Sequence, residues 1–128
     1  MKKIIIVLSI IMMASCSSKI NFPVSNVTPG AEISVKKSKD DNGNSKLSLN
    51  AKYLTSPERL SPSRSFYLVW LQTKSNGVLN LGILETDSSS KASFETITPY
   101  EPDEIFITAE DNAAVKYPTG QEISRAKF

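Results

Sequence analysis

The 128-residue sequence contains no histidine and a single cysteine, Cys16. Without histidine the chain cannot build a Ser-His-Asp or Cys-His catalytic site, a His-ligated zinc site or a haem with an axial histidine. The methionines Met1, Met12 and Met13 all precede the cysteine, so only oxygen ligands remain for a metal in the rest of the chain. These absences exclude most common hydrolase mechanisms. We therefore expect no cofactor, no metal site and no enzymatic activity.

The beginning of the sequence has the layout of a secretory signal peptide. Lys2 and Lys3 precede an apolar run over residues 4–13 that only Ser9 interrupts, and two small residues follow it. A helix of ten residues is about 15 Å long, roughly half the hydrocarbon thickness of a bilayer. The run is therefore too short to cross a membrane stably.

The motif Met-Ala-Ser-Cys over residues 13–16 resembles the lipobox of bacterial lipoproteins. This resemblance implies that the signal peptide is residues 1–15, that it is cleaved before Cys16, and that Cys16 is acylated, with palmitate among the acyl chains expected. Two or three acyl chains anchor a protein stably where one does not, and a lone cysteine cannot form an internal disulfide. We therefore expect Cys16 to bind the chain to a membrane of the cell envelope. By resemblance to lipoprotein sorting in enteric bacteria, Ser17 implies the outer membrane, facing the periplasm or the surface. In an organism without an outer membrane, the same anchor would hold the domain on the outside of the plasma membrane.

The balance of charge excludes one class of partner. The chain carries 15 basic and 13 acidic residues, and loss of residues 1–15 removes Lys2 and Lys3, which leaves 13 of each. A neutral mature chain has no electrostatic footprint for nucleic acid and no strong attraction to anionic lipid. We expect no nucleic-acid partner, and no role for the membrane beyond the anchor.

The pattern of the mature chain predicts strands. Residues 16–27 contain the lipidated cysteine and a tether without sustained periodicity. The remaining segments alternate apolar and polar residues or form short runs of aromatic and β-branched residues, which is typical of strands. Asn42-Gly43 and Asn76-Gly77 predict type I′ hairpin turns. The strands are expected around residues 33–35, 47–53, 66–71, 78–84, 94–97, 105–109 and 123–128.

Seven or eight short strands in about 100 residues predict an antiparallel immunoglobulin-like β-sandwich over residues 28–128. The absence of a cysteine pair excludes a true antibody-type domain. Tyr53 continues the alternation of the preceding strand and is expected in the core. The centre of the core is expected to comprise Phe66, Tyr67, Trp70, Phe94 and Phe106.

Several segments together resemble the extracytoplasmic domain of anti-sigma-K factors. They are residues 67–71, Gly77, and residues 81–84, 105–110 and 117–120. The resemblance implies a β-sandwich outside the cytoplasm. Family members bind their sigma factor through a cytoplasmic domain that a transmembrane helix joins to the sandwich, and this sequence has neither. We therefore expect the sensor-like domain alone, used for another purpose.

Two local motifs have ordinary structural interpretations. Residues 40–44, Asp-Asp-Asn-Gly-Asn, superficially match a calcium loop, but the glycine comes fourth rather than sixth and Ala51 replaces the bidentate glutamate. We interpret them as a hairpin turn. Residues 88–91 match the S-x-x-K motif of serine β-lactam-binding enzymes without its S-D-N and K-T-G partners. We interpret them as a solvated loop.

The chain has one concentration of acidic residues. Paired carboxylates could hydrolyse a glycosidic bond or bind calcium weakly, but flanking prolines favour a solvated surface edge. The residues are Glu101, Asp103, Glu104, Glu110 and Asp111.

Tyr100 and Tyr117 lie beside loop prolines, and tyrosine is enriched in recognition surfaces, so they are the candidate partner contacts. The sequence thus favours a non-enzymatic, lipid-anchored envelope lipoprotein that serves as a protein-binding or sensor-like accessory module. Two alternatives stay open. One is a small carboxylate-based hydrolase outside the cytoplasm, and the other is a regulatory sensor that acts through a membrane partner.

Overall fold

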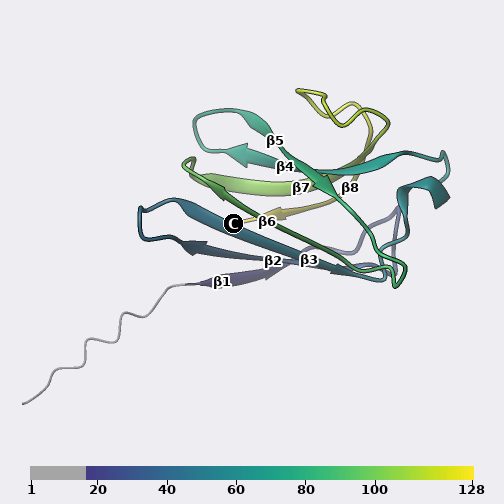
Figure 1. Ribbon diagram of the computed structural model, residues 1–128, viewed down its shortest axis with the longest axis horizontal. Coiled ribbons are helices and arrows are strands. Elements are labelled where there is room, and N and C mark those ends of the chain that lie inside the picture. Colours follow the sequence, from purple (N-terminus) through teal and green to yellow (C-terminus); the bar gives the residue numbers. More distant parts are fainter. Residues whose placement is uncertain (1–16) are drawn as a thin grey trace, which may run out of the picture.

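A computed structural model describes residues 17–128, so the predicted signal peptide and Cys16 lie outside the described residues. The chain forms two antiparallel sheets of four strands each, which lie face to face (Figure 1). This confirms the predicted immunoglobulin-like β-sandwich. The elements are β1 (Ser18–Asn21), β2 (Glu32–Lys39), β3 (Ser45–Lys52), the 3-10 helix η1 (Pro57–Arg59), β4 (Phe66–Thr73), β5 (Val78–Leu84), β6 (Ala92–Thr98), β7 (Pro102–Glu110) and β8 (Gln121–Lys127).

The strand order is β1-β2-β3-β6 in one sheet and β5-β4-β7-β8 in the other. Strands that are consecutive in the chain pair within one sheet in four cases, which are β1-β2, β2-β3, β4-β5 and β7-β8. The other connections from β3 onward cross between the sheets, which places β6 beside β3 and β7 beside β4. These crossings close both sheets around one core, as in immunoglobulin-like sandwiches. No helix within residues 17–128 is long and apolar enough to span a membrane.

Both predicted hairpin turns are present, but they are not type I′. Gly43 and Gly77 have φ values of 78° and 73°, whereas Tyr53 and Ser90 are the only non-glycine residues with positive φ within residues 17–128. Asn42 and Asn76 therefore keep negative φ, which a type I′ turn does not allow. Each connection is instead a turn that ends in a left-handed glycine, the form common in longer hairpin loops.

The segment predicted as a tether is part of the sandwich. Residues 18–21 form β1 and pair with β2, with Ile20 opposite Val35. Phe22 is buried in the core, and Ser124 Oγ donates a 2.8 Å hydrogen bond to the carbonyl of Pro23. The four-residue strand is too short to give a periodic pattern, which is why the sequence suggested a loop. Ser17 alone thus separates Cys16 from the folded domain.

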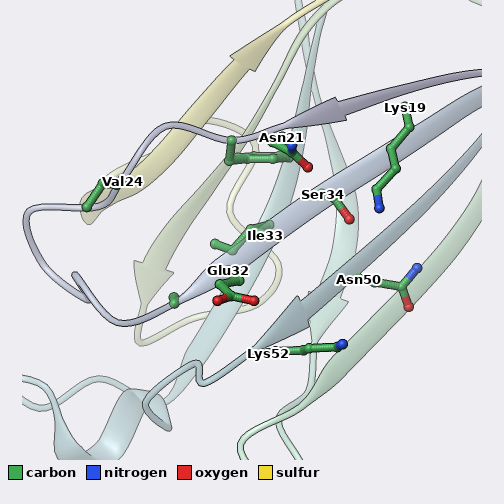
Figure 2. Close-up of a pocket in the computed structure, with 10 residues that line it drawn as sticks. Lys19, Asn21, Val24, Glu32, Ile33, Ser34, Asn50 and Lys52 are labelled. Carbon is green, nitrogen blue, oxygen red and sulfur yellow. The ribbon is translucent and has the colours of Figure 1, made fainter.

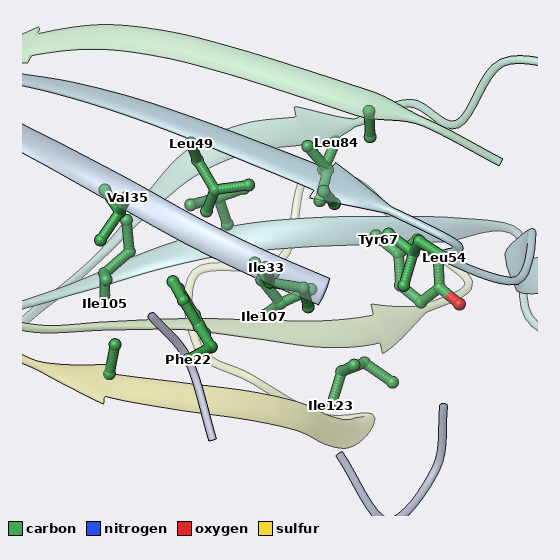
Figure 3. Close-up of a cluster of buried hydrophobic side chains, with 14 of the residues drawn as sticks. Phe22, Ile33, Val35, Leu49, Leu54, Tyr67, Leu84, Ile105, Ile107 and Ile123 are labelled. Carbon is green, nitrogen blue, oxygen red and sulfur yellow. The ribbon is translucent and has the colours of Figure 1, made fainter. Parts of the chain in front are cut away.

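The core lies between the inner faces of the two sheets (Figure 3). One sheet contributes Val35 and Leu49, and the other contributes Tyr67, Ile105 and Ile107, all of them almost inaccessible to solvent. Their alternate positions along each strand direct them to the same face. Burial of these apolar side chains is the main contribution to the stability of the fold.

The predicted centre of the core is wrong for three of its five aromatic residues, because Phe66, Trp70 and Phe106 belong to the second apolar cluster on the outer face. Along β4 Tyr67 points into the sandwich, so Trp70, three residues later, points out of it. Trp70 and Phe106 stack on the outer face, with ring centroids 6.2 Å apart. Phe66 and Phe94 are only partly buried. Tyr53 is 65% exposed, because β3 ends one residue earlier and the backbone turns there.

The sandwich has two ends, which we call proximal and distal (Figure 1). The proximal end is the one at which Ser17 enters β1, and it comprises residues 40–44, 74–77 and 99–101. Lys74 N donates to the carbonyl of Glu101, which joins two of these loops. The distal end is the opposite one and comprises residues 22–31, 53–65, 85–91 and 111–120.

Candidate functional site at loop 111–120

Loop 111–120 connects β7 to β8 and folds back over the outer face of their sheet. Ala113 and Val115 pack against the second apolar cluster, which comprises Leu68, Trp70 and Phe106. Trp70 is completely buried although it lies on an outer face. The loop therefore acts as a cover for these side chains.

A chain of hydrogen bonds fixes the base of this loop. Trp70 Nε1 donates to Thr108 Oγ1 at 2.8 Å, and Thr108 Oγ1 donates to Glu110 Oε2 at 2.6 Å. From the loop, Thr119 Oγ1 donates to Glu110 Oε1 at 2.6 Å, and the Thr119 backbone N–H lies 3.3 Å from both carboxylate oxygens. Glu110 thus joins β4, β7 and the end of the loop.

The surroundings of Glu110 favour its ionised form. Desolvation acts to raise the pKa of this carboxyl, but hydrogen bonds from Thr108, Thr119 and the backbone of Gly120 outweigh it and hold the pKa below its ordinary value. The sequence predicted a solvated acidic residue here, yet Glu110 is 1% exposed. The prediction is therefore wrong for Glu110, because donor groups of three residues, Thr108, Thr119 and Gly120, replace the hydrogen bonds that water would donate.

Two further residues hold the loop in place. Asn80 Nδ2 donates to the carbonyls of Ala113 and Val115, both at 3.0 Å, while its Oδ1 accepts from Gly82 N. A Cβ on Gly120 would lie 1.7 Å from the carbonyl oxygen of Ala109, so only glycine fits there. The sequence gave no indication that Asn80 would reach this loop.

Tyr117 is the exposed aromatic residue of this loop, with 72% of its surface accessible. It lines a hollow of about 490 Å³ between β5 and the loop, together with Asn80 and Lys116. Tyr100, the other predicted contact, is 38% exposed and lies in the connection before β7. Because β7 separates them, the two tyrosines lie at opposite ends of the sandwich and form no common patch.

Three of the four remaining carboxylates of the acidic concentration form salt bridges with lysine or arginine side chains, whereas Asp103 is exposed and forms none within residues 17–128. Glu101 lies 3.5 Å from Lys37 Nζ and 3.2 Å from Lys39 Nζ. Asp111 lies 2.8 Å from Arg64, and Glu104 lies 2.8 Å from Arg125, whose guanidinium also covers the Phe106 ring. Within residues 17–128 no group of three His, Cys, Asp or Glu side chains could hold a metal ion.

The two motif-like segments form turns. Asp40 Oδ1 accepts hydrogen bonds from the backbone N–H groups of Asn42 and Asn44, and the Asn44 bond is the main cause that lowers the pKa of Asp40. In residues 88–91 no helix forms, and Asp87 Oδ1 accepts from the backbone of Ser89 and Lys91. Each carboxylate thus accepts hydrogen bonds from the backbone N–H groups of its own turn.

The outer face of the other sheet has a hollow of about 360 Å³ beside β1 (Figure 2). Polar side chains of β1, β2 and β3 form its floor, and Val24 of the distal connection lies at its rim (Figure 2). The polar residues are Lys19, Asn21, Glu32, Ser34, Asn50 and Lys52.

Comparison with protein-family models, with curated proteins and with solved structures gave no match. The resemblance to anti-sigma-K factors and the lipobox therefore stay predictions from the sequence.

Proposed function

We propose that this protein is a non-enzymatic lipoprotein of the cell envelope that binds another envelope protein through loop 111–120. The observation that carries this proposal is the loop itself, which is fixed at its base by Glu110 and exposes Tyr117. A loop that is already ordered loses little conformational entropy on binding. Tyrosine adds a large contact area with few rotatable bonds.

The lipobox-like sequence before Cys16 supports the anchor, and the localisation that follows from it is the outer membrane. In this arrangement Ser17 leads directly into β1 at the proximal end, while loop 111–120 belongs to the distal end. The loop would then point away from the bilayer, toward a partner in the periplasm or outside the cell. A sensor role is the same arrangement with a membrane regulator as the partner.

The arrangement of the carboxylates favours binding over hydrolysis. A glycosidase needs two carboxyl groups that face each other across a cleft. Here Glu104 binds Arg125, Glu110 binds Thr108 and Thr119, and the acidic residues are distributed along the whole of β7. Neither Glu104 nor Glu110 is therefore left free to transfer a proton to a substrate.

Site-specific photo-crosslinking in intact cells tests the proposal. A photoreactive phenylalanine analogue replaces Tyr117, and the same analogue at the exposed Tyr53 and at Tyr100 serves as a matched control. We expect one discrete protein crosslinked from position 117 and not from position 53, and its loss in the Cys16→Ala chain. Equal crosslinking from all three positions, or none from position 117, would overturn the proposal. The mass of the peptide that contains Cys16 tests the anchor independently, because acyl chains would add to this mass.

A further inference from the structure

Lysines that face the same side of the sheet cluster next to the predicted anchor. Lys19 of β1 lies directly opposite Lys36 of β2, and both are exposed. Lys46 of β3 lies opposite Ser38, two residues beyond Lys36 along β2 and on the same outer face. Like charges opposite each other in a sheet are destabilising unless something between them compensates.

No carboxylate within residues 17–128 forms a salt bridge with these three lysines. Of the acidic groups at the proximal end, Glu101 binds Lys37 and Lys39, Asp40 accepts hydrogen bonds within its turn, and Asp41 lies exposed in the same turn without a salt bridge to these lysines. On the same outer face Glu95 lies beside Ser48, which donates to it at 3.3 Å. The neutral net charge of the mature chain therefore conceals a local positive surface.

An exposed apolar side chain completes this surface. Ile97 of β6 lies opposite Lys46 and is 56% exposed. Long apolar side chains beside lysines are typical of surfaces that contact the interface of a bilayer. We call Lys19, Lys36, Lys46 and Ile97 the proximal patch.

The length of the chain sets the distance between the patch and the anchor. Consecutive Cα atoms are 3.8 Å apart, so the Cα of Cys16 lies within about 7.6 Å of that of Ser18. Ser18 pairs with Lys37, and β2 continues for two residues, about 6.6 Å, in the direction of the anchor. Acyl chains on Cys16 would thus bring the proximal end to the headgroups without any tether.

We propose that the proximal patch binds the anionic headgroups of the bilayer and fixes the orientation of the sandwich on the membrane. This inference rests on the proposed function, because it requires acylated Cys16. The acyl chains supply the attachment, and the lysines supply the orientation, with the β1-β2-β3 face tilted toward the lipid. Loop 111–120 belongs to the opposite sheet and the opposite end, and is therefore held away from the membrane.

The test uses the acylated protein, purified from membranes and reconstituted into vesicles. The labelling rate of an Ile97→Cys chain reports the accessibility of the proximal patch, and that of a Ser89→Cys chain reports the accessibility of the distal end. On vesicles of phosphatidylethanolamine with phosphatidylglycerol, we expect a membrane-impermeant maleimide to label position 97 several-fold more slowly than position 89. On phosphatidylcholine vesicles the difference should disappear.

Charge reversal provides the matched control. The Lys19→Glu/Lys36→Glu/Lys46→Glu chain should lose the protection of position 97, whereas Lys52→Glu/Lys91→Glu/Lys116→Glu, with the same change of charge at the distal end, should keep it. Equal labelling on the two lipids, or equal loss in both triple variants, would overturn the inference. Protection by inorganic phosphate on phosphatidylcholine vesicles would indicate a site for a soluble anion and overturn it as well.

The mass of the Cys16 peptide separates the two proposals. If Cys16 is acylated and position 97 is not protected, the orientation fails while the anchored binding module stands. If Cys16 carries no acyl chain, the anchor fails, and the orientation fails with it.

Discussion

Thr119 Oγ1 donates a 2.6 Å hydrogen bond to Glu110 Oε1, and this bond joins the end of loop 111–120 to the last residue of β7. The acceptor is a buried carboxylate, so the bond is charge-assisted and stronger than one between neutral groups. Because Glu110 also receives the Thr108 hydroxyl, the loop is coupled to the strand on which it rests. The conformation of the loop therefore depends on a small number of polar contacts.

Replacement of Thr119 by valine should loosen the loop. Valine keeps the shape of the side chain but removes the hydroxyl, which leaves one oxygen of the Glu110 carboxylate with a weaker donor. We expect a loss of about 1–3 kcal/mol in the free energy of unfolding, measured by urea denaturation. Trp70, the single tryptophan, lies under the loop, so its fluorescence should shift toward longer wavelengths.

Thr96→Val is the matched control for this substitution. Thr96 lies in β6, on the other sheet, and its hydroxyl makes no hydrogen bond within residues 17–128. Its replacement should leave both the stability and the fluorescence nearly unchanged. If Thr119→Val behaves as Thr96→Val does, the hydrogen bond does not hold the loop.

The lowered pKa of Glu110 predicts a loss of stability in acid. A carboxyl whose pKa is lower in the folded than in the unfolded state stabilises the fold at pH values above its unfolded pKa. This contribution is lost as the pH falls through the folded pKa, because the proton then displaces the donated hydrogen bonds. The acid limb is the part of the stability curve in which stability falls as the pH decreases. In Glu110→Gln this limb should be shallower than in the unmodified chain, as measured by thermal denaturation across acidic pH. Parallel acid limbs would contradict this role of the carboxylate.

Gly120→Ala should be more harmful than its small volume suggests. The added methyl group would lie 1.7 Å from the Ala109 carbonyl oxygen and 3.2 Å from the carboxyl carbon of Glu110. The backbone must move to relieve this clash, which separates Thr119 from Glu110. We expect destabilisation of about 1–3 kcal/mol together with faster amide exchange in residues 111–120.

Gly30→Ala is the control, because a Cβ at Gly30 meets no atom within 4 Å and Gly30 is not among the glycines with positive φ. This change should be neutral or slightly stabilising, since it reduces the freedom of the unfolded chain. Similar losses in both variants would show that the close contact at Gly120 is not the cause.

The fold could be predicted from the sequence, whereas the site could be predicted only in part. Alternation at period two and two Asn-Gly turns indicate a sandwich, since both signals are local. The burial of Trp70 could not be predicted, because it depends on a loop more than forty residues away in the chain. Glu110 and Asn80 are polar residues whose role appears only when that loop reaches them.

The first strand of the domain could not be predicted from its own residues either. Residues 18–21 contain only one apolar side chain, Ile20, so no period is visible. Their strand forms because β2 offers an unpaired edge and Phe22 enters the core. Such a strand depends on its partner, and its own composition carries almost no information about it.

Tyr67 connects the core to the distal end. Its raised pKa predicts a loss of stability in alkali. Its side chain is fully buried and its hydroxyl donates to the Thr55 carbonyl. Desolvation, with a smaller contribution from Glu58, raises the pKa of Tyr67 from 10.0 to about 12. Since the folded state holds the proton more tightly than the unfolded state, this contribution to stability is complete below pH 10 and is lost as the pH rises through 12.

Tyr67→Phe tests this coupling at two pH values. Near neutral pH the variant should lose about 1–2 kcal/mol of unfolding free energy, because the Thr55 carbonyl loses its donor inside the protein. In alkali the difference between the variant and the unmodified chain should shrink, because the unmodified chain then loses the advantage that the phenol gave it. Tyr53→Phe, at an exposed position, should show neither effect. A constant difference across this pH range would mean that the Tyr67 hydroxyl contributes packing alone, and that its proton plays no part in stability.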